Sequence, residues 1–157
     1  MFDINNYIED EIYFKKISGS KLVYYKNNKI QFYLKNCKNI TRITEYKGKK
    51  NILVKIDDKY KNFFNTLEKK FLNEECKKEE NMISLMKSNK NGTIIKLKVN
   101  KRNNRTYINI FDKYKDEITE DEFESNCNID CLIEFDRFWE YNDKYGYIIL
   151  VKKIYIK

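Results

Sequence analysis

The chain has 157 residues, a usual size for one domain, and 41% of them are hydrophobic and 15% aromatic, which excludes a disordered polypeptide. No apolar stretch is long enough to span a membrane. The net charge is +8. The chain contains no His, so the commonest general base and the Ser-His and Cys-His nucleophile pairs are missing.

The N-terminus and the cysteines indicate an intracellular protein without a metal or cofactor. Residues 1–6 have neither the basic nor the apolar region of a signal peptide. Of the four cysteines only Cys127 and Cys131 are close in sequence, and no His can complete a mixed zinc site. We therefore expect reduced thiols.

Charge is distributed in blocks. Residues 15–61 hold 14 Lys and Arg against 3 Asp and Glu, and residues 87–105 hold 7 against none. Residues 112–143 hold 3 against 12. Such blocks are typical either of solvated faces of opposite sign or of a positive track for phosphates with an acidic flank.

The first sixty residues predict strands. Residues 12–17 and 21–25 flank a turn at residues 18–20, and residues 26–28 form the next turn because Asn tolerates positive φ. Residues 51–56 alternate between apolar and polar side chains. Residues 29–35 also alternate, with Ile30, Phe32 and Leu34 on one face and Lys29, Gln31, Tyr33 and Lys35 on the other.

One helix follows these strands. Asp57 or Asp58 can cap its start. Its apolar residues recur at helical spacing and predict a core-facing stripe of Tyr60, Phe63, Phe64, Leu67 and Phe71. Residues 73–91 are charged and rich in Asn, which favours a long, partly helical connection.

The second half predicts a sheet again. Residues 93–99 alternate, residues 100–105 predict a basic turn, and residues 106–111 are expected to be the hairpin partner strand. Thr119 to Glu122 fits a capping box for one helical turn. Residues 129–140 and 146–156 predict two long closing strands. Without a repeat or a flexible linker, residues 1–157 form one domain, with residues 1–11 as a loose acidic segment.

Basic residues interleaved with aromatic residues on strands are the main functional signal. Binders of single-stranded nucleic acid combine cations for phosphates with flat rings on which bases stack. The outer face of residues 29–35 offers this combination, and so does the segment from residue 96 to residue 107. The predicted binding residues are Lys29, Gln31, Tyr33, Lys35, Lys96, Lys98, Lys101, Arg102, Arg105 and Tyr107.

Two features of residues 129–140 have alternative interpretations. Trp139 shares strand parity with Ile133 and Phe135, which predicts a core position, whereas a bulge before it turns the ring outward. Asp130 and Glu134 either lie on a solvent face or hold a divalent ion in a small nuclease.

Several stretches resemble the single-stranded DNA-binding OB-fold proteins of nucleocytoplasmic large DNA viruses, which are distantly similar to phage replicative binding proteins. The stretches are residues 21–33, 60–71, 92–99 and 107–112, and the closing pattern of Cys131, Trp139, Gly146 and Val151. The resemblance implies a viral protein in the host cytoplasm or nucleus that binds single-stranded DNA and contacts replication proteins.

We therefore expect a mainly β (α+β) fold, a five-stranded OB-like Greek-key barrel with extra strands and one or two helices. The predicted function is sequence-tolerant binding of single-stranded DNA, without catalysis, in viral DNA replication, recombination or repair. An RNA-binding or transcription-associated OB module and a viral structural or host-interaction protein are the alternatives. Self-association stays open.

Overall fold

The computed structural model describes residues 1–102, 105–106 and 108–157. Over these residues the fold is mainly β, with one α-helix, α1 (Asp58–Glu74), and the short 3-10 helices η1 (Glu9–Glu11), η2 (Glu79–Asn81) and η3 (Glu120–Glu122). The strands are β1 (Ile12–Ile17), β2 (Ser20–Tyr25), β3 (Asn28–Asn39), β4 (Thr44–Tyr46), β5 (Lys49–Ile56), β6 (Met82–Ile83), β7 (Met86–Asn89), β8 (Gly92–Val99), β9 (Lys101–Arg102), β10 (Arg105–Thr106), β11 (Asn109–Phe111), β12 (Glu117–Ile118), β13 (Asn128–Tyr141) and β14 (Lys144–Ile156). None of the described helices has the length and apolarity needed to cross a membrane.

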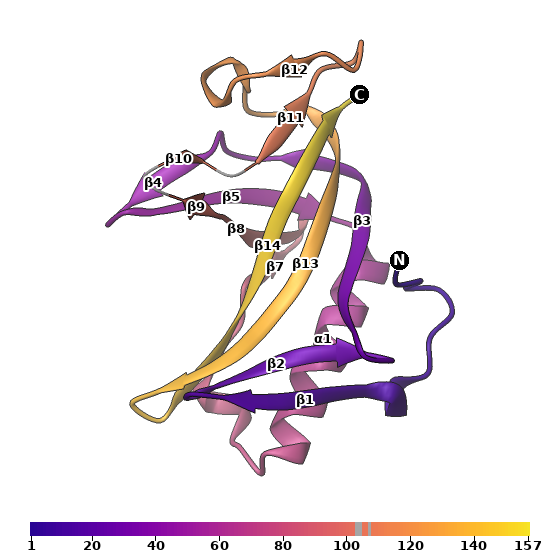
Figure 1. The fold of residues 1–157 in the computed structure, drawn as a ribbon, viewed down its shortest axis with the longest axis vertical. Helices are drawn as coiled ribbons and strands as arrows, with labels where there is room; N and C mark the ends of the chain where they lie inside the picture. Colours follow the sequence, from indigo (N-terminus) through magenta and orange to yellow (C-terminus); the bar gives the residue numbers. More distant parts are fainter. Residues whose placement is uncertain (103–104, 107) are drawn as a thin grey trace.

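Five strands pair in a closed ring. β3 pairs with β5, β5 with β8, β8 with β14, β14 with β13, and β13 again with β3. All these pairs are antiparallel except β8 with β14, which is parallel. The complete sheet has 12 strands, more than the five of the predicted barrel. The long β13–β14 hairpin runs most of the length of the molecule, and its tip lies beside β1 and β2 (Figure 1).

The strands form where the sequence alternates. Every second residue is buried in β8, in β5 from Ile52 and in β3 as far as Leu34, which matches the predicted faces of residues 29–35, 51–56 and 93–99. Lys35 and Asn36 are both exposed, so the alternation of β3 changes phase there. The turn between β2 and β3 is also where it was predicted. Lys26 and Asn27 adopt positive φ values of 47° and 68°, the conformation that two-residue hairpin loops require.

Helix α1 lies on one side of the sheet, behind β2, β3 and β13 in Figure 1. All five residues of the predicted stripe are buried. Their rings pack against rings of the strands: Phe71 stacks on Phe138 with centroids 4.2 Å apart, and Phe63 meets Phe32 edge to face at 5.5 Å. The aromatic stripe of α1 is therefore part of the core.

The first residues of the chain pack against the domain. Phe2 is buried, and its backbone N–H donates to the carbonyl of Gln31 at 3.0 Å. Its ring lies 5.1 Å from the rings of both Tyr25 and Phe63. Phe2 therefore anchors the start of the chain to the core, whereas Ile8, Glu9 and Asp10 are exposed.

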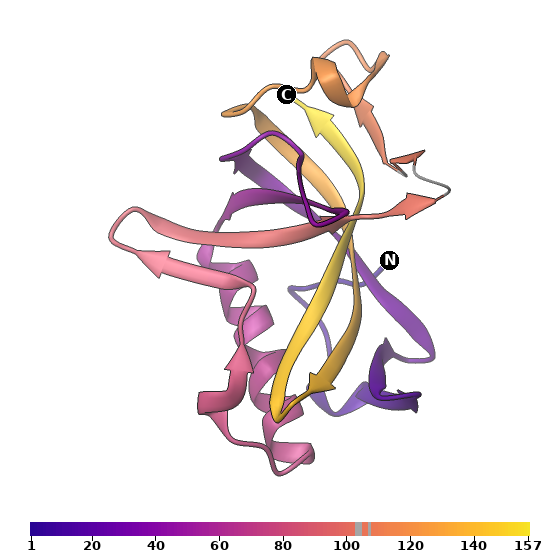
Figure 2. The same ribbon diagram turned by 90° about the vertical axis from the view of Figure 1, so that its left-hand side faces the viewer.

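Two other predicted elements differ from the structure. Residues 73–91, predicted as a long, partly helical connection, contain the helical turn η2 but also the strands β6 and β7, and β7 pairs with β8. That hairpin projects from the body of the molecule, as Figure 2 shows. Residues 109–111 form β11, which pairs in parallel with β14 and not with β8 as a hairpin partner. The capping box at Thr119 and Glu122 is present in η3.

Candidate nucleic-acid interface

The outer face of β3 carries the first group of predicted residues. Ile30, Phe32 and Leu34 point into the core, so Lys29, Gln31, Tyr33 and Lys35 lie on the opposite side of the strand. Lys35 is exposed and the other three side chains are half-buried. The strand parity is as predicted, but the surroundings of these residues are not those of a free basic surface.

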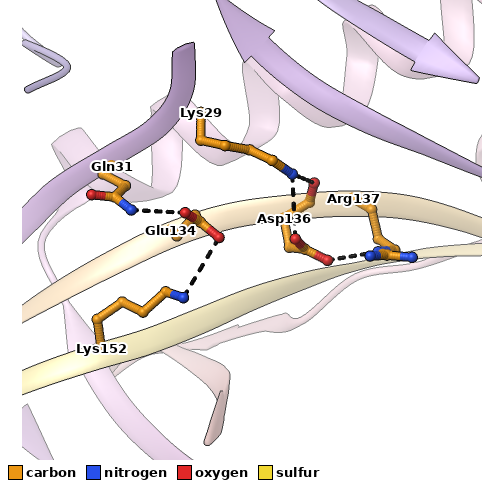
Figure 3. A network of polar contacts seen from close by, with 6 residues as sticks. All are labelled: Lys29, Gln31, Glu134, Asp136, Arg137 and Lys152. Carbon is orange, nitrogen blue, oxygen red and sulfur yellow. Dashed lines mark hydrogen bonds and ion pairs between the residues drawn. The ribbon is translucent and has the colours of Figure 1, made fainter. Parts of the chain in front are cut away.

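Carboxylates from β13 face this surface (Figure 3). Lys29 Nζ lies 3.4 Å from Asp136 Oδ1 and donates to the Asp136 carbonyl at 3.2 Å. Gln31 Nε2 donates to Glu134 Oε1 at 2.7 Å, and Lys152 Nζ lies 3.7 Å from the other oxygen of Glu134. These cations therefore already have anionic partners.

We call Asp130, Glu134 and Asp136 the β13 carboxylate row. They alternate with buried residues along β13, as expected for one face of a strand. Asp130 accepts a hydrogen bond of 2.8 Å from the backbone N–H of Asn36 and pairs with Lys157 at 3.3 Å. Asp130 and Glu134 are thus held by neighbouring donors, and no group of three His, Cys, Asp or Glu side chains suited to a metal ion occurs among the described residues.

Tyr33 is not an isolated ring between lysines. Its centroid lies 6.2 Å from that of Tyr155, and Tyr155 stacks on Phe111 at 5.1 Å with an interplanar angle of 15°. Burial and the neighbouring Tyr155 raise the pKa of the Tyr33 hydroxyl above its ordinary value. The three rings form a partly covered row across β3, β14 and β11.

A second surface carries lysines without anionic partners. We call it the β5–β8 lysine face, and its members are Lys38, Lys55, Lys87, Lys96 and Lys98. Lys38 lies opposite Lys55, which lies opposite Ile94, and Ile94 lies opposite Lys87. Lys96 and Lys98 follow along β8 on the same side. In the part of the chain that the structure describes, none of the five forms an ion pair. Only Lys96 and Lys98 of this face were predicted.

The remaining predicted residues lie beyond β8. Lys101, in β9, forms an ion pair with Glu45. Arg102 and Arg105 are opposite each other in the small β9–β10 hairpin, where Arg105 is exposed. Tyr107 lies outside the described residues. The expected continuous hairpin from Lys96 to Tyr107 is wrong, because β9 and β10 form a separate two-stranded sheet.

Trp139 does not lie in the core, which corrects the position predicted from strand parity. The register of β13 against β14 shifts between Phe135 and Arg137, so Phe138 takes the buried position and Trp139 turns outward. Trp139 is half-buried and lies opposite Ser20 of β2 and Gly146 of β14. The sequence allowed this bulge, but it did not show where a bulge occurs.

A surface hollow of about 500 Å³ connects Trp139 to the lysine face. Lys98, Arg137 and Trp139 contribute to its wall, together with the aliphatic side chains of Ile148 and Leu150. Lys98, the Arg137–Asp136 ion pair, an indole ring and apolar side chains therefore meet at one place. This combination can accommodate a flat, apolar group that carries a negative charge beside it.

The cysteines offer no reactive site in the core. Cys37 and Cys131 are buried, and burial raises the pKa of the Cys37 thiol to about 12. Burial also raises the pKa of Cys131. All four thiols are free.

The fold is a largely closed β-sheet with one helix, of the OB-like kind found in single-stranded DNA-binding proteins. It is similar to the solved single-stranded DNA-binding protein of bacteriophage Enc34. The structure of that protein in complex with single-stranded DNA superposes on this chain with a TM-score of 0.53 at 12% sequence identity. The match covers 91% of this chain and 92% of the phage chain. A C-terminal truncation of the phage protein gives a TM-score of 0.56 at 10% identity, covering 94% of both chains.

No family model and no curated protein matches the sequence. The similarity thus concerns the fold, which the phage protein shares with this chain over nine-tenths of both lengths. The similarity agrees with the predicted distant resemblance to phage single-stranded DNA-binding proteins. It does not support the predicted resemblance to the proteins of nucleocytoplasmic large DNA viruses.

Proposed function

We propose that this protein binds single-stranded DNA with little sequence preference, in support of viral DNA replication, recombination or repair. The observation that carries the proposal is the β5–β8 lysine face, a basic surface without ion pairs among the described residues, on the outside of a closed β-sheet. Lysines without carboxylate partners can neutralise phosphates without first breaking an ion pair. The fold similarity to a phage protein in complex with single-stranded DNA supports this proposal.

In this proposal the ring of β3, β5, β8, β14 and β13 is the five-stranded Greek-key barrel of an OB fold. The bound DNA strand crosses β5 and β8, where its phosphates contact Lys38, Lys55, Lys96 and Lys98. Lys29 and Gln31 can contact a phosphate only after they give up their contacts with the β13 carboxylate row. They therefore contribute less to the binding of DNA than the unpaired lysines do. The setting we propose is an infected cell, in the cytoplasm or nucleus, together with replication proteins.

The proposal is tested by fluorescence anisotropy with labelled oligo(dT), oligo(U) and a duplex of equal length. We expect oligo(dT) to bind more tightly than the duplex. The double variant Lys96→Gln/Lys98→Gln should weaken this binding, because it removes two cations from the face. The matched control is Lys69→Gln/Lys78→Gln, which removes two exposed lysines from α1 and the loop after it.

The other outcomes separate the alternatives. Preference for oligo(U) would identify an RNA-binding protein, and no binding to any probe would favour a structural or host-interaction protein. We also expect no cleavage of a labelled strand with Mg²⁺ or Mn²⁺, because Asp130 and Glu134 are engaged by neighbouring donors. Cleavage that disappears in Asp130→Asn or Glu134→Gln would contradict this.

A further inference from the structure

Trp139 is the one tryptophan of the chain, and its local structure leaves its ring accessible. The bulge in β13 turns the side chain outward, where it is half-buried rather than enclosed. No described residue accepts a hydrogen bond from the indole N–H or stacks on the ring. A large aromatic side chain that is partly in water and lacks both kinds of partner is a candidate contact for a ligand.

The residues on both sides of Trp139 are small. A Cβ atom at Gly146 would lie 2.2 Å from Cζ2 and 2.5 Å from Cε2 of the indole, so no larger residue fits there without moving the ring. On the other side Trp139 faces Ser20 of β2. Gly146 thus lets the indole lie close against β14 and fixes its position on the sheet surface.

Charged side chains of both signs line the two hollows beside the ring. Trp139 lines the hollow that contains Lys98, Arg137 and Asp136, and it also lines a second hollow of about 350 Å³ that contains Lys16, Lys21, Glu75 and Glu140. Lys16 and Lys98 have no ion-pair partner in the described segments, whereas Lys21 pairs with Glu75 and Arg137 with Asp136. Each of the two hollows therefore contains one cation without an ion-pair partner among the described residues.

We propose that Trp139 is a stacking platform for one base of the bound single strand, with Lys98 and Lys16 holding the phosphates on either side of that nucleotide. Indole rings stack on any base, because every base has a π-face, so the contact is independent of sequence. The platform continues the β5–β8 lysine face through Lys98. This inference rests on the proposed function and identifies where a base is held.

The single tryptophan makes the test specific. Labelled oligo(dT) is titrated with protein while its anisotropy is recorded, and the tryptophan emission of the protein is recorded in the reverse titration. We expect the emission to fall in a saturable way with the same midpoint as the anisotropy. Trp139→Ala should weaken binding about 5- to 150-fold, whereas Trp139→Phe, which keeps a ring, should lose less. The matched control is Tyr114→Ala, which removes an exposed ring from the loop between β11 and β12.

The outcomes distinguish this inference from the proposed function. Binding by anisotropy without a change in tryptophan emission, or equal affinity of Trp139→Ala and the unmodified protein, would overturn the stacking platform and leave the proposed function intact. No change in anisotropy would instead overturn the proposed function. If Trp139→Ala does not fold in a thermal melt, the emission titration of the unmodified protein still decides.

Discussion

Phe32 and Tyr33 are neighbours in β3 and face opposite sides of the sheet. Phe32 is buried against rings of α1, whereas Tyr33 is half-buried beside Tyr155. We expect Phe32→Ala to lower the free energy of unfolding by ~3–5 kcal/mol, because it leaves a cavity in the core. Tyr33→Ala should lower it by only ~0.5–1.5 kcal/mol, the usual value of an aromatic pair. Chemical denaturation of both variants measures the difference.

The same pair tests the predicted stacking role of Tyr33. Tyr33→Ala should weaken oligo(dT) binding about 5-fold, the low end of the range for a stacked base, because the ring already packs on Tyr155. If Tyr33→Ala unfolds the domain and Phe32→Ala does not, the two faces of β3 are assigned the wrong way round.

Glu68 of α1 is a residue whose charge opposes folding. One of its carboxylate oxygens, Oε1, is buried without a hydrogen-bond partner among the residues described. Burial raises the pKa of Glu68 above its ordinary value and outweighs the nearby Ser84 and Tyr147 hydroxyls, which lower it, so the folded protein binds this proton more tightly than the unfolded chain does. The stability that the fold has with Glu68 protonated is therefore fully present below the pKa of the unfolded state. It is lost as the pH rises through the raised pKa of the folded state.

Glu68→Gln should raise the melting temperature near neutral pH, since the amide resembles the protonated acid. The gain should disappear below about pH 4, where the carboxyl is protonated in both states. Thermal melts across this pH range measure the effect, with the exposed Glu80→Gln as the control. A gain that is independent of pH would show that the charge of Glu68 is not the cause.

At the scale of an element, the β13 carboxylate row decides how much the β3 face contributes to binding. Glu134→Gln removes one negative charge that pairs with Lys152 but keeps the size of the side chain. We expect it to raise the affinity for oligo(dT) about 2- to 5-fold, which corresponds to ~0.5–1 kcal/mol for a partly exposed ion pair. Anisotropy titrations measure the change, with Glu79→Gln of η2 as the control. Unchanged or weaker binding would mean that the row only stabilises the fold.

Elements governed by local pattern were predictable from the sequence. The alternation of β3 and β5, the stripe of α1 and the turn at Lys26 and Asn27 each follow from residues that are neighbours in sequence. Elements governed by distant pairing were not. β11 pairs with β14, some forty residues further along the chain (Ile110 with Ile154), and no feature of residues 109–111 specifies that partner.

The features of the candidate site were likewise predictable where a local pattern determines them, and not where distant pairing does. Parity placed Lys29, Tyr33, Lys96 and Lys98 on outer faces. It did not show that Asp136 of β13 pairs with Lys29 of β3. The sequence left Trp139 open between a core position, which strand parity favours, and an outward one, because the register shift after Phe135 depends on how β13 pairs with its neighbours. A single inserted residue in a strand reverses every later side chain, and the sequence contains no independent mark of it.

At the scale of the whole molecule, the charge blocks of the sequence occupy different regions. The acidic block at residues 112–143 divides into β12 and η3, which lie with β11 at one end of the molecule (top of Figure 1), and β13, whose carboxylates pair with lysines of β3 and β14. The basic segments 15–61 and 87–105 supply the unpaired lysines of β5 and β8. The lysine face therefore concentrates five positive charges that have no ion-pair partner among the described residues.

This separation predicts a strong dependence of binding on salt. The five lysines of the face, with Lys16 beside Trp139, can neutralise about four to six phosphates, which implies a log-log slope of affinity against salt of roughly −3 to −4 at ~0.7 counterions per phosphate. The slope is measured by anisotropy with oligo(dT) over a range of NaCl concentrations. Lys96→Gln/Lys98→Gln should make it shallower by about 1.4, because two fewer phosphates are neutralised, while Glu134→Gln should make it steeper. An affinity that does not change with salt would mean that the lysines do not contact phosphates and that the surface binds a different partner.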